Sequence, residues 1–201
     1  KVKYLESFSD MGVPVFLADI KGDLGGCVKK GAENENITKR LDSMGISRDE
    51  FIFTGYPVRF WDVFGEGGHP VRTTVSEMGS TLLSRLLGLT DVQSGVMDIV
   101  FRVADDKGWL LIDYKDLRAM VSYVAEHSKE LLNDYGNVTK QSVGAIQRSL
   151  LRLEDEGAEA FFGEPSIDIS DWIQTNEKGQ GYINILHCVR LYHSPLLYST
   201  F

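Results

Sequence analysis

Four capped helical patterns follow one another between residues 73 and 162, and they restrict this chain to folds that contain a helical bundle. Each pattern begins at a side chain that accepts a hydrogen bond from a free helical N–H; these are Thr74, Thr90, Asp113 and Thr139. Two of the starts, Thr74-Val-Ser-Glu77 and Thr90-Asp-Val-Gln93, are capping boxes. Each helix carries one apolar stripe as wide as a core face, so we expect the helices to pack on one another.

The apolar stripes name the residues expected in the core of this bundle. The first stripe is predicted to be Val75, Met78, Leu82, Leu83 and Leu86, and the second Val92, Val96, Ile99, Val100 and Val103. The third is Leu117, Met120, Val121 and Val124, and the fourth is Val143, Ile146, Leu150 and Leu153.

The sequence on both sides of the helical block alternates between helix and strand. The predicted order is a helix through Val2, Leu5 and Phe8, a buried parallel strand at 13–19, a helix capped by Asn36 and ended by Gly45, and a strand at 57–64. After the block, Ser170 is expected to cap a brief helix, a strand follows at 182–186, and Ser194 is expected to cap a helix that begins at Pro195. This alternation predicts an α/β fold with an inserted all-helical subdomain, divided into segments 1–72, 73–162 and 163–201.

Composition narrows the functional classes. The formal net charge is −8, and Lys29-Lys30 is the one adjacent basic pair near a loop, so we do not expect this segment to hold DNA by itself. No apolar run reaches the roughly 18 residues of a membrane-spanning helix, and no basic-then-apolar leader opens the chain, so we expect no membrane contact and a cytoplasmic location. The two cysteines, Cys27 and Cys188, are expected to be reduced thiols.

Both ends of the chain are expected to continue in a longer protein. The first helix lacks a capping residue before Val2, and the helix expected after Ser194 would have little room before Phe201. The alternative is that two short, frayed helices lie at the ends.

Several motifs resemble one family. Val15-Phe-Leu-Ala-Asp-Ile-Lys-Gly-Asp-Leu24 resembles the second strand of HerA/FtsK-type P-loop ATPases, where Asp-Pro-Lys-Gly-acidic is common. Further segments are similar to the YjgR-like branch of these ATPases; they are 61–72, 92–96, 113–119, 142–148 and 161–165. The resemblance covers essentially the whole chain and implies a partial P-loop NTPase-type parallel sheet.

The resemblance also implies an activity for the parent protein. It implies an ATP-dependent, homohexameric motor, a DNA helicase or translocase, that binds ATP and Mg²⁺ and reaches DNA through other parts of the chain. The family's phosphate-binding loop, Gly-x-x-x-x-Gly-Lys-Thr, does not occur in this sequence and is expected before Lys1. Its second acidic motif, an apolar strand that ends in Asp-Glu, is expected beyond Phe201, because the strand at 182–186 ends in His187 and Cys188 instead. We therefore expect the fragment alone neither to bind nor to hydrolyse ATP.

The candidate site residues follow from this comparison. Asp19, Lys21 and Asp23 stand at the carboxyl end of a predicted parallel strand, where ligands bind in open α/β sheets, and they are the predicted cofactor-binding residues. The alternative is a solvated loop in which Asp19 caps a turn and Lys21 pairs with Asp23. Arg72 is the candidate arginine finger, ahead of Arg148 and Arg152, which fit better as a solvated helix face paired with Glu156.

The sequence does not support a metal site or a serine nucleophile. The four histidines have no ligand spacing, so no metal site is predicted, and no Gly-x-Ser-x-Gly occurs. Two other functions stay open. One is a regulatory or protein-interaction module without ATP turnover of its own, which a large exposed apolar patch on residues 74–160 would favour. The other is a secretion-coupling ATPase, which shares the Asp-x-Lys-Gly-acidic strand.

Overall fold

The computed structural model describes residues 2–47, 49 and 51–201, and the chain divides into two compact units. The first unit contains the described residues up to Trp61 together with Asp168–Cys188. The second contains Asp62–Ile167 and Val189–Phe201. Each unit thus joins two separate stretches of chain, whereas the segments 1–72, 73–162 and 163–201 are contiguous; as a domain division those segments stay a prediction.

A small parallel sheet forms the centre of the first unit. Strand β4 (Ile183–His187) lies between β1 (Val15–Asp19) and β2 (Val58–Asp62), and both pairings are parallel. In the strand order β1-β4-β2-β3, the last member is the two-residue strand β3 (His69–Pro70), whose residues belong to the second unit. The last strand in sequence is therefore inserted between the first two, and the predicted α/β class with parallel strands is confirmed.

Burial differs between the central and the outer strand. The first four residues of β4 are buried, because neighbours cover both sides of this strand. In β1 the side chains alternate, and Phe16 is 41% exposed. The prediction of a buried strand at 13–19 was therefore wrong, because β1 lies at an edge of the sheet and only its last residue, Asp19, is buried.

Each face of the sheet has its own packing. On one face, Cys27, Ile183 and Ile185 form a core against which Leu5 of α1 (Val2–Asp10) and Leu24 of the 3₁₀ turn η1 (Leu24–Val28) pack. The side chain of Asn184, which alternates with these residues along β4, is fully buried. Its amide accepts a hydrogen bond from Trp61 Nε1 at 2.9 Å and donates one to the Trp172 carbonyl at 2.9 Å.

Two predicted caps in this unit were placed two residues too late. Helix α2 (Glu35–Met44) begins after Asn34, whose side chain accepts from the Ile37 N–H, and not after Asn36. The brief turn η2 (Ile169–Asp171) is capped by Asp168, not by Ser170. In both places two polar residues stood close together, and the one with an extended backbone took the cap.

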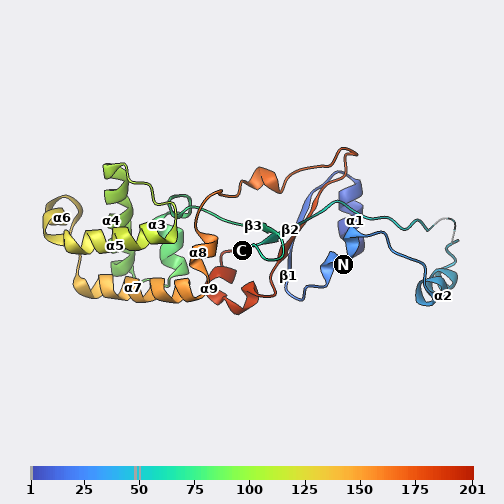
Figure 1. Ribbon diagram of the computed structural model, residues 1–201, viewed down its shortest axis with the longest axis horizontal. Helices are drawn as coiled ribbons and strands as arrows, with labels where there is room; N and C mark the ends of the chain where they lie inside the picture. The colour runs from blue at the N-terminus through green and yellow to red at the C-terminus, as the bar shows by residue number, and fades with distance from the viewer. Residues whose placement is uncertain (1, 48, 50) are drawn as a thin grey trace. The chain divides into compact units, whose positions relative to one another are not determined.

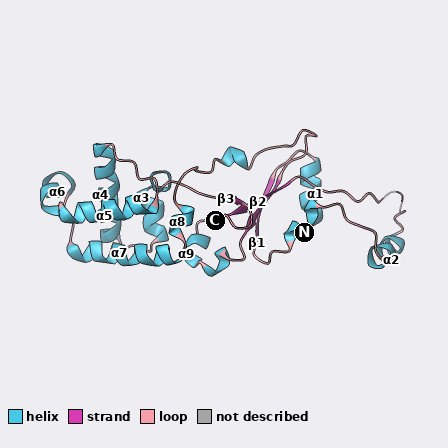
Figure 2. Cartoon of the chain, in the orientation of Figure 1, coloured by secondary structure: helices cyan, strands magenta, loops and turns pink. Residues whose placement is uncertain are grey.

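The second unit is built mainly of helices, as predicted. It contains α3 (Val75–Leu86), α4 (Asp91–Lys107), α5 (Tyr114–Glu126), α6 (Ser128–Tyr135), α7 (Lys140–Asp155) and α8 (Ala158–Phe161). Between Val75 and Phe161, a stretch that the structure describes in full, no strand occurs (Figure 2). Helices α4, α5 and α7 pack on one another (Figure 1). The four predicted caps are all confirmed.

Two of the predicted stripes contain errors. Leu82 is 56% exposed and Val92 69% exposed, although both were assigned to the core. Gly79 has φ 73° and ψ 164°, which breaks the helical phase of α3, so that Ser84 in its second half and Leu87 directly after it are also buried. In α4 the buried stripe begins one turn later, at Val96 and Met97.

The chain ends in the turn η3 (Leu191–His193) and the short helix α9 (Pro195–Tyr198). The prediction that Ser194 caps α9 through its side chain was wrong. The carboxylate of Glu156, at the end of α7, accepts from the N–H groups of Leu196 at 2.8 Å and Leu197 at 3.3 Å. Ser194 Oγ instead donates to the Glu156 carbonyl. A cap from another segment leaves no local sequence signal.

Candidate functional site

Asp19, the last residue of β1, organises the loop that follows this strand. Its side chain is buried, and its carboxylate accepts hydrogen bonds from the N–H groups of Gly22 at 2.8 Å, Leu24 at 3.0 Å and Asp23 at 3.3 Å. Gly22 has φ 73°, a value that glycine adopts without strain. Asp19 therefore holds the loop in one conformation, as in the turn-capping alternative raised from the sequence.

Asp62 performs the same task at the carboxyl end of β2. This buried carboxylate accepts from the N–H groups of Phe64 at 2.9 Å, Glu66 at 3.0 Å and Gly67 at 2.8 Å. Asp62 was not among the site residues predicted from the sequence. The signal was available, because an aspartate that ends a strand before a glycine-rich loop is the pattern already singled out at Asp19.

The three predicted cofactor-binding residues line one pocket of the first unit. The pocket has a volume of about 550 Å³, and its apolar part consists of Leu5, Leu17, Ala18, Ile20 and Leu24. Its polar part is Asp19, Lys21 and Asp23. The structure thus brings together the residues that the sequence singled out, at the carboxyl end of a parallel strand. Their role in binding a cofactor stays a prediction.

Lys21 and Asp23 are free for a ligand as far as the described residues are concerned. Both are exposed, and neither side chain forms a hydrogen bond or ion pair with another described residue. The pairing between Lys21 and Asp23 that sequence analysis raised is therefore not formed. An exposed ammonium can contact a phosphate, and an exposed carboxylate can accept from a metal-bound water, whereas the Asp19 carboxylate is occupied by the backbone.

The neighbouring strand β4 contributes no acidic pair to this edge. It ends at His187, followed by the buried Cys188, whose N–H donates to the Asp19 carbonyl at 2.9 Å. This agrees with the sequence argument that the strand near 182–186 does not carry the family's Asp-Glu motif.

The candidate arginine finger is held within the second unit. Arg72 Nη1 donates to the Glu164 carbonyl at 3.0 Å, and the Arg72 carbonyl accepts from the Ile167 N–H at 2.9 Å. Its Nε is buried and has no hydrogen-bond partner among the described residues. The structure therefore shows how Arg72 is anchored, and its role as a finger stays a prediction.

One of the ion pairs predicted on α7, between Arg152 and Glu156, is not formed. Arg152 donates to Ser149 Oγ at 3.1 Å. Glu156, its expected partner, uses its carboxylate for the N-terminus of α9.

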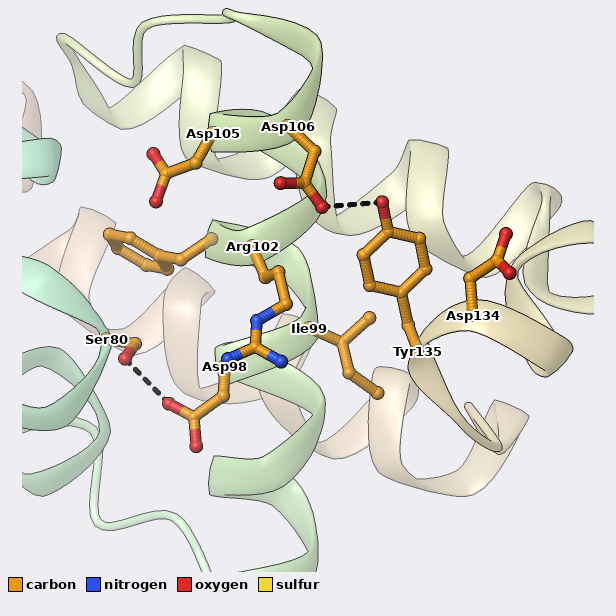
Figure 3. A pocket seen from close by; sticks show the side chains of 9 residues that line it. Ser80, Asp98, Ile99, Arg102, Asp105, Asp106, Asp134 and Tyr135 are labelled. Atoms are coloured by element: carbon orange, nitrogen blue, oxygen red, sulfur yellow. Dashed lines mark hydrogen bonds between the residues drawn. The ribbon is translucent and has the colours of Figure 1, made fainter.

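A second pocket, of about 610 Å³, lies in the helical unit between α3, α4 and α6 (Figure 3). Its lining includes four carboxylates, those of Asp98, Asp105, Asp106 and Asp134, and one arginine, Arg102. Ser80 donates to Asp98 at 2.6 Å and Tyr135 to Asp106 at 2.8 Å. The bond to Asp106 raises the pKa of Tyr135. No group of three or more His, Cys, Asp or Glu side chains within the described part of the chain is arranged to hold a metal ion.

The parallel strands, with an open pocket at the carboxyl end of one of them, define an α/β protein. The model of one family, helicase HerA-like C-terminal, matches residues 2–201, and the chain belongs to this family. No curated protein and no solved structure matches the chain. Among the described residues, no helix combines the length and the apolar character needed to cross a bilayer.

Proposed function

We propose that this chain is part of an ATP-dependent motor in which the pocket at the end of β1 lies beside the bound nucleotide. Membership of the helicase HerA-like C-terminal family supports a motor ATPase. The observation that carries the proposal is the convergence of Asp19, Lys21 and Asp23 on one open pocket at the carboxyl end of a parallel strand. The finer assignment to the YjgR-like branch is part of this proposal.

The residues of this pocket fit a supporting role toward a nucleotide. Lys21 would contact a phosphate oxygen, and Asp23 would accept from a water on Mg²⁺. Asp19 would keep both at a fixed place through its three backbone hydrogen bonds. When bound, Mg²⁺ neutralises charge on the phosphate oxygens. The sequence holds no Gly-x-x-x-x-Gly-Lys-Ser/Thr loop, so these residues would flank the nucleotide while another segment holds its phosphates.

The proposed assembly is a homohexamer that hydrolyses ATP at its subunit interfaces and moves along DNA. Arg72 would complete a neighbouring site. DNA contact would be made by other parts of the protein, because the second unit contains seventeen Asp and Glu residues against eleven Lys and Arg. A surface of this charge repels the phosphate backbone.

A second function is an interaction module without ATP turnover of its own. It is favoured by the exposed side chains of Trp109 and Leu110 in the helical unit, which are 46% and 74% exposed. A large exposed apolar patch on residues 74–160 is the feature that was expected for such a module, and these two side chains contribute apolar surface there.

The test is ATP hydrolysis by the full-length protein that contains this chain. Lys21→Ala is expected to lower kcat by about tenfold or more, because each charge-assisted contact to a phosphate contributes about 1.5–3 kcal/mol. Lys29→Ala is the matched control, since Lys29 is exposed in the same loop region and does not line the pocket. An equal kcat for Lys21→Ala and the natural protein would show that Lys21 does not contact the nucleotide. Absence of hydrolysis in the natural protein would favour the interaction module.

A further inference from the structure

The loop between α4 and α5 presents two large apolar side chains next to each other. Trp109 is 46% exposed and Leu110 74% exposed, and both line a pocket of about 340 Å³. The remaining lining of this pocket consists of Leu111, Asp116, Ala119, Met120 and Tyr123. Tryptophan, tyrosine and methionine are enriched where proteins bind one another.

The backbone of this loop is fixed at its first residues by the end of α4. Gly108 has φ 68°, its N–H bonds to the Asp105 carbonyl at 3.0 Å, and the Trp109 N–H bonds to the Ala104 carbonyl at 2.9 Å. These two bonds form the Schellman motif, which sets the direction of the chain leaving the helix.

The rest of the loop is bonded to two other helices. The backbone N–H of Ser76, at the start of α3, donates to the Leu111 carbonyl at 2.8 Å. The Ser76 hydroxyl accepts from the Leu111 N–H at 3.2 Å. The carboxylate of Asp116 accepts from the N–H groups of Ile112 at 2.9 Å and Asp113 at 3.1 Å. Because the loop is held on both sides, Trp109 and Leu110 lose little conformational freedom when a partner binds.

Aromatic packing supports the floor of the pocket. The rings of Trp109 and Tyr123 meet edge to face with centroids 5.0 Å apart, and His127 stacks on Tyr123 at 4.1 Å. The indole is thus held in position by the rings beneath it, while nearly half of its surface stays open to a partner.

The charge at the rim of this pocket points to an acidic partner. The Lys107 ammonium lies 5.2 Å from the Trp109 ring centroid and 5.6 Å from that of Tyr123. It forms no ion pair with any residue that the structure describes. The one carboxylate in the lining, Asp116, is occupied by the loop backbone. A partner carboxylate would therefore find an available cation beside the apolar pocket.

We propose that this pocket docks a short segment of a partner protein in which an apolar side chain stands next to an aspartate or glutamate. The apolar side chain enters between Trp109, Met120 and Tyr123, and the carboxylate meets Lys107. A second copy of this chain fits less well, because two facing pockets would bring two Lys107 ammonium groups together without a free carboxylate.

The test uses a library of random 12-residue peptides displayed on phage and selected on the full-length protein. Trp109→Ala serves to deplete peptides that bind elsewhere. The expected result is enrichment of an apolar residue next to Asp or Glu, and at least a tenfold loss of affinity of the selected synthetic peptide for Trp109→Ala in fluorescence anisotropy. Lys107→Glu is expected to enrich Lys or Arg in place of the acidic residue.

The control is Val92→Ala, since Val92 is exposed on α4 and lies outside the pocket. This variant is expected to bind the selected peptide with unchanged affinity. Lys107→Glu changes an exposed side chain, so its result does not depend on how well Trp109→Ala folds. Failure to select any peptide that depends on Trp109, or no acidic preference among those selected, would overturn the proposal. Self-association in sedimentation velocity that Trp109→Ala abolishes would assign the surface to a second copy instead.

Discussion

Asp19 shows how one side chain can prepare a site without itself being available to a ligand. Its carboxylate accepts three backbone hydrogen bonds, and Lys21 and Asp23 are presented by the loop that those bonds hold. The same device at Asp62 holds the loop after β2. Both loops leave the carboxyl end of a parallel strand, where ligand-binding loops of α/β proteins are found.

Asp19→Asn is expected to lower the free energy of unfolding by about 2 kcal/mol, because the amide has one acceptor oxygen and turns an NH₂ group toward a backbone N–H. Urea unfolding of the chain measures this change. Asp23→Asn is the control, since its exposed carboxylate makes no hydrogen bond with the described residues, and its effect should stay within about 0.5 kcal/mol. Equal effects of the two substitutions would show that the Asp19 bonds contribute little.

Tyr114 links α5 to α7 and makes the free energy of unfolding decrease at alkaline pH. Its hydroxyl shares one proton between two acceptors, the Leu150 carbonyl at 2.7 Å and the Glu154 carboxylate at 3.0 Å. Burial, and then the neighbouring Glu154, raise the pKa of Tyr114 well above its ordinary value. The unfolded chain releases this proton near pH 10 while the folded chain keeps it, so the stabilisation is complete below pH 10 and is lost as the pH rises beyond that value.

Tyr114→Phe is therefore expected to destabilise the chain by about 1–2 kcal/mol at pH 8, where the hydrogen bond is lost, and by about 1 kcal/mol less at pH 11. Guanidinium unfolding at the two pH values measures the difference. A difference between the two proteins that is the same at both pH values would contradict the raised pKa.

At the scale of elements, Gly79 decides which side chains of α3 reach the core. With φ 73° and ψ 164° it occupies a region that residues with a Cβ rarely adopt, and it separates the two halves of the helix. Gly79→Ala is expected to cost about 1–3 kcal/mol. Gly95→Ala, in the regular helix α4 with open space around the added methyl, should instead stabilise by about 0.5–1 kcal/mol. Thermal unfolding of both variants checks the opposite signs; destabilisation by both would contradict this account.

The sequence predicted the elements better than the directions of their side chains. Thr74, Thr90, Asp113 and Thr139 could be read as caps because a cap depends on residues three positions apart. Leu82 was misplaced because a glycine with positive φ inside a helix leaves no periodic signal. The Glu156 cap of α9 joins segments about forty residues apart, and only the tertiary fold shows it.

Part of the candidate site could be predicted because its residues are close together in the sequence. Asp19, Lys21 and Asp23 lie within five consecutive residues at the end of a strand, so local sequence was enough to bring them together. The pocket at Trp109 needed the fold, because Trp109 and Tyr123 meet only after α5 turns back against the loop. The role of Arg72 stays a prediction, since an arginine finger acts on a neighbouring subunit.

At the scale of the whole molecule, the two units differ in what they offer. The first contains the parallel sheet and the pocket that we assign to the neighbourhood of a nucleotide. The second contains the helices and an excess of acidic residues, and it carries the proposed docking pocket. This division suits a motor in which one part responds to the nucleotide and the other recruits a protein partner.

The central claim is that Lys21 lies beside the phosphates of a bound nucleotide, and lysine acylation tests it most directly. An acyl-phosphate derivative of ATP, incubated with Mg²⁺ and the full-length protein, transfers its acyl group to a lysine amine near the phosphates and releases ATP. Peptide mass spectrometry then locates the modified residue. If Lys21 lies beside the phosphates, Lys21 is acylated, excess ATP suppresses this acylation, and Lys29 and Lys30 stay unmodified. Saturable acylation elsewhere that leaves Lys21 unmodified, or labelling of Lys21 that ATP does not suppress, would contradict it.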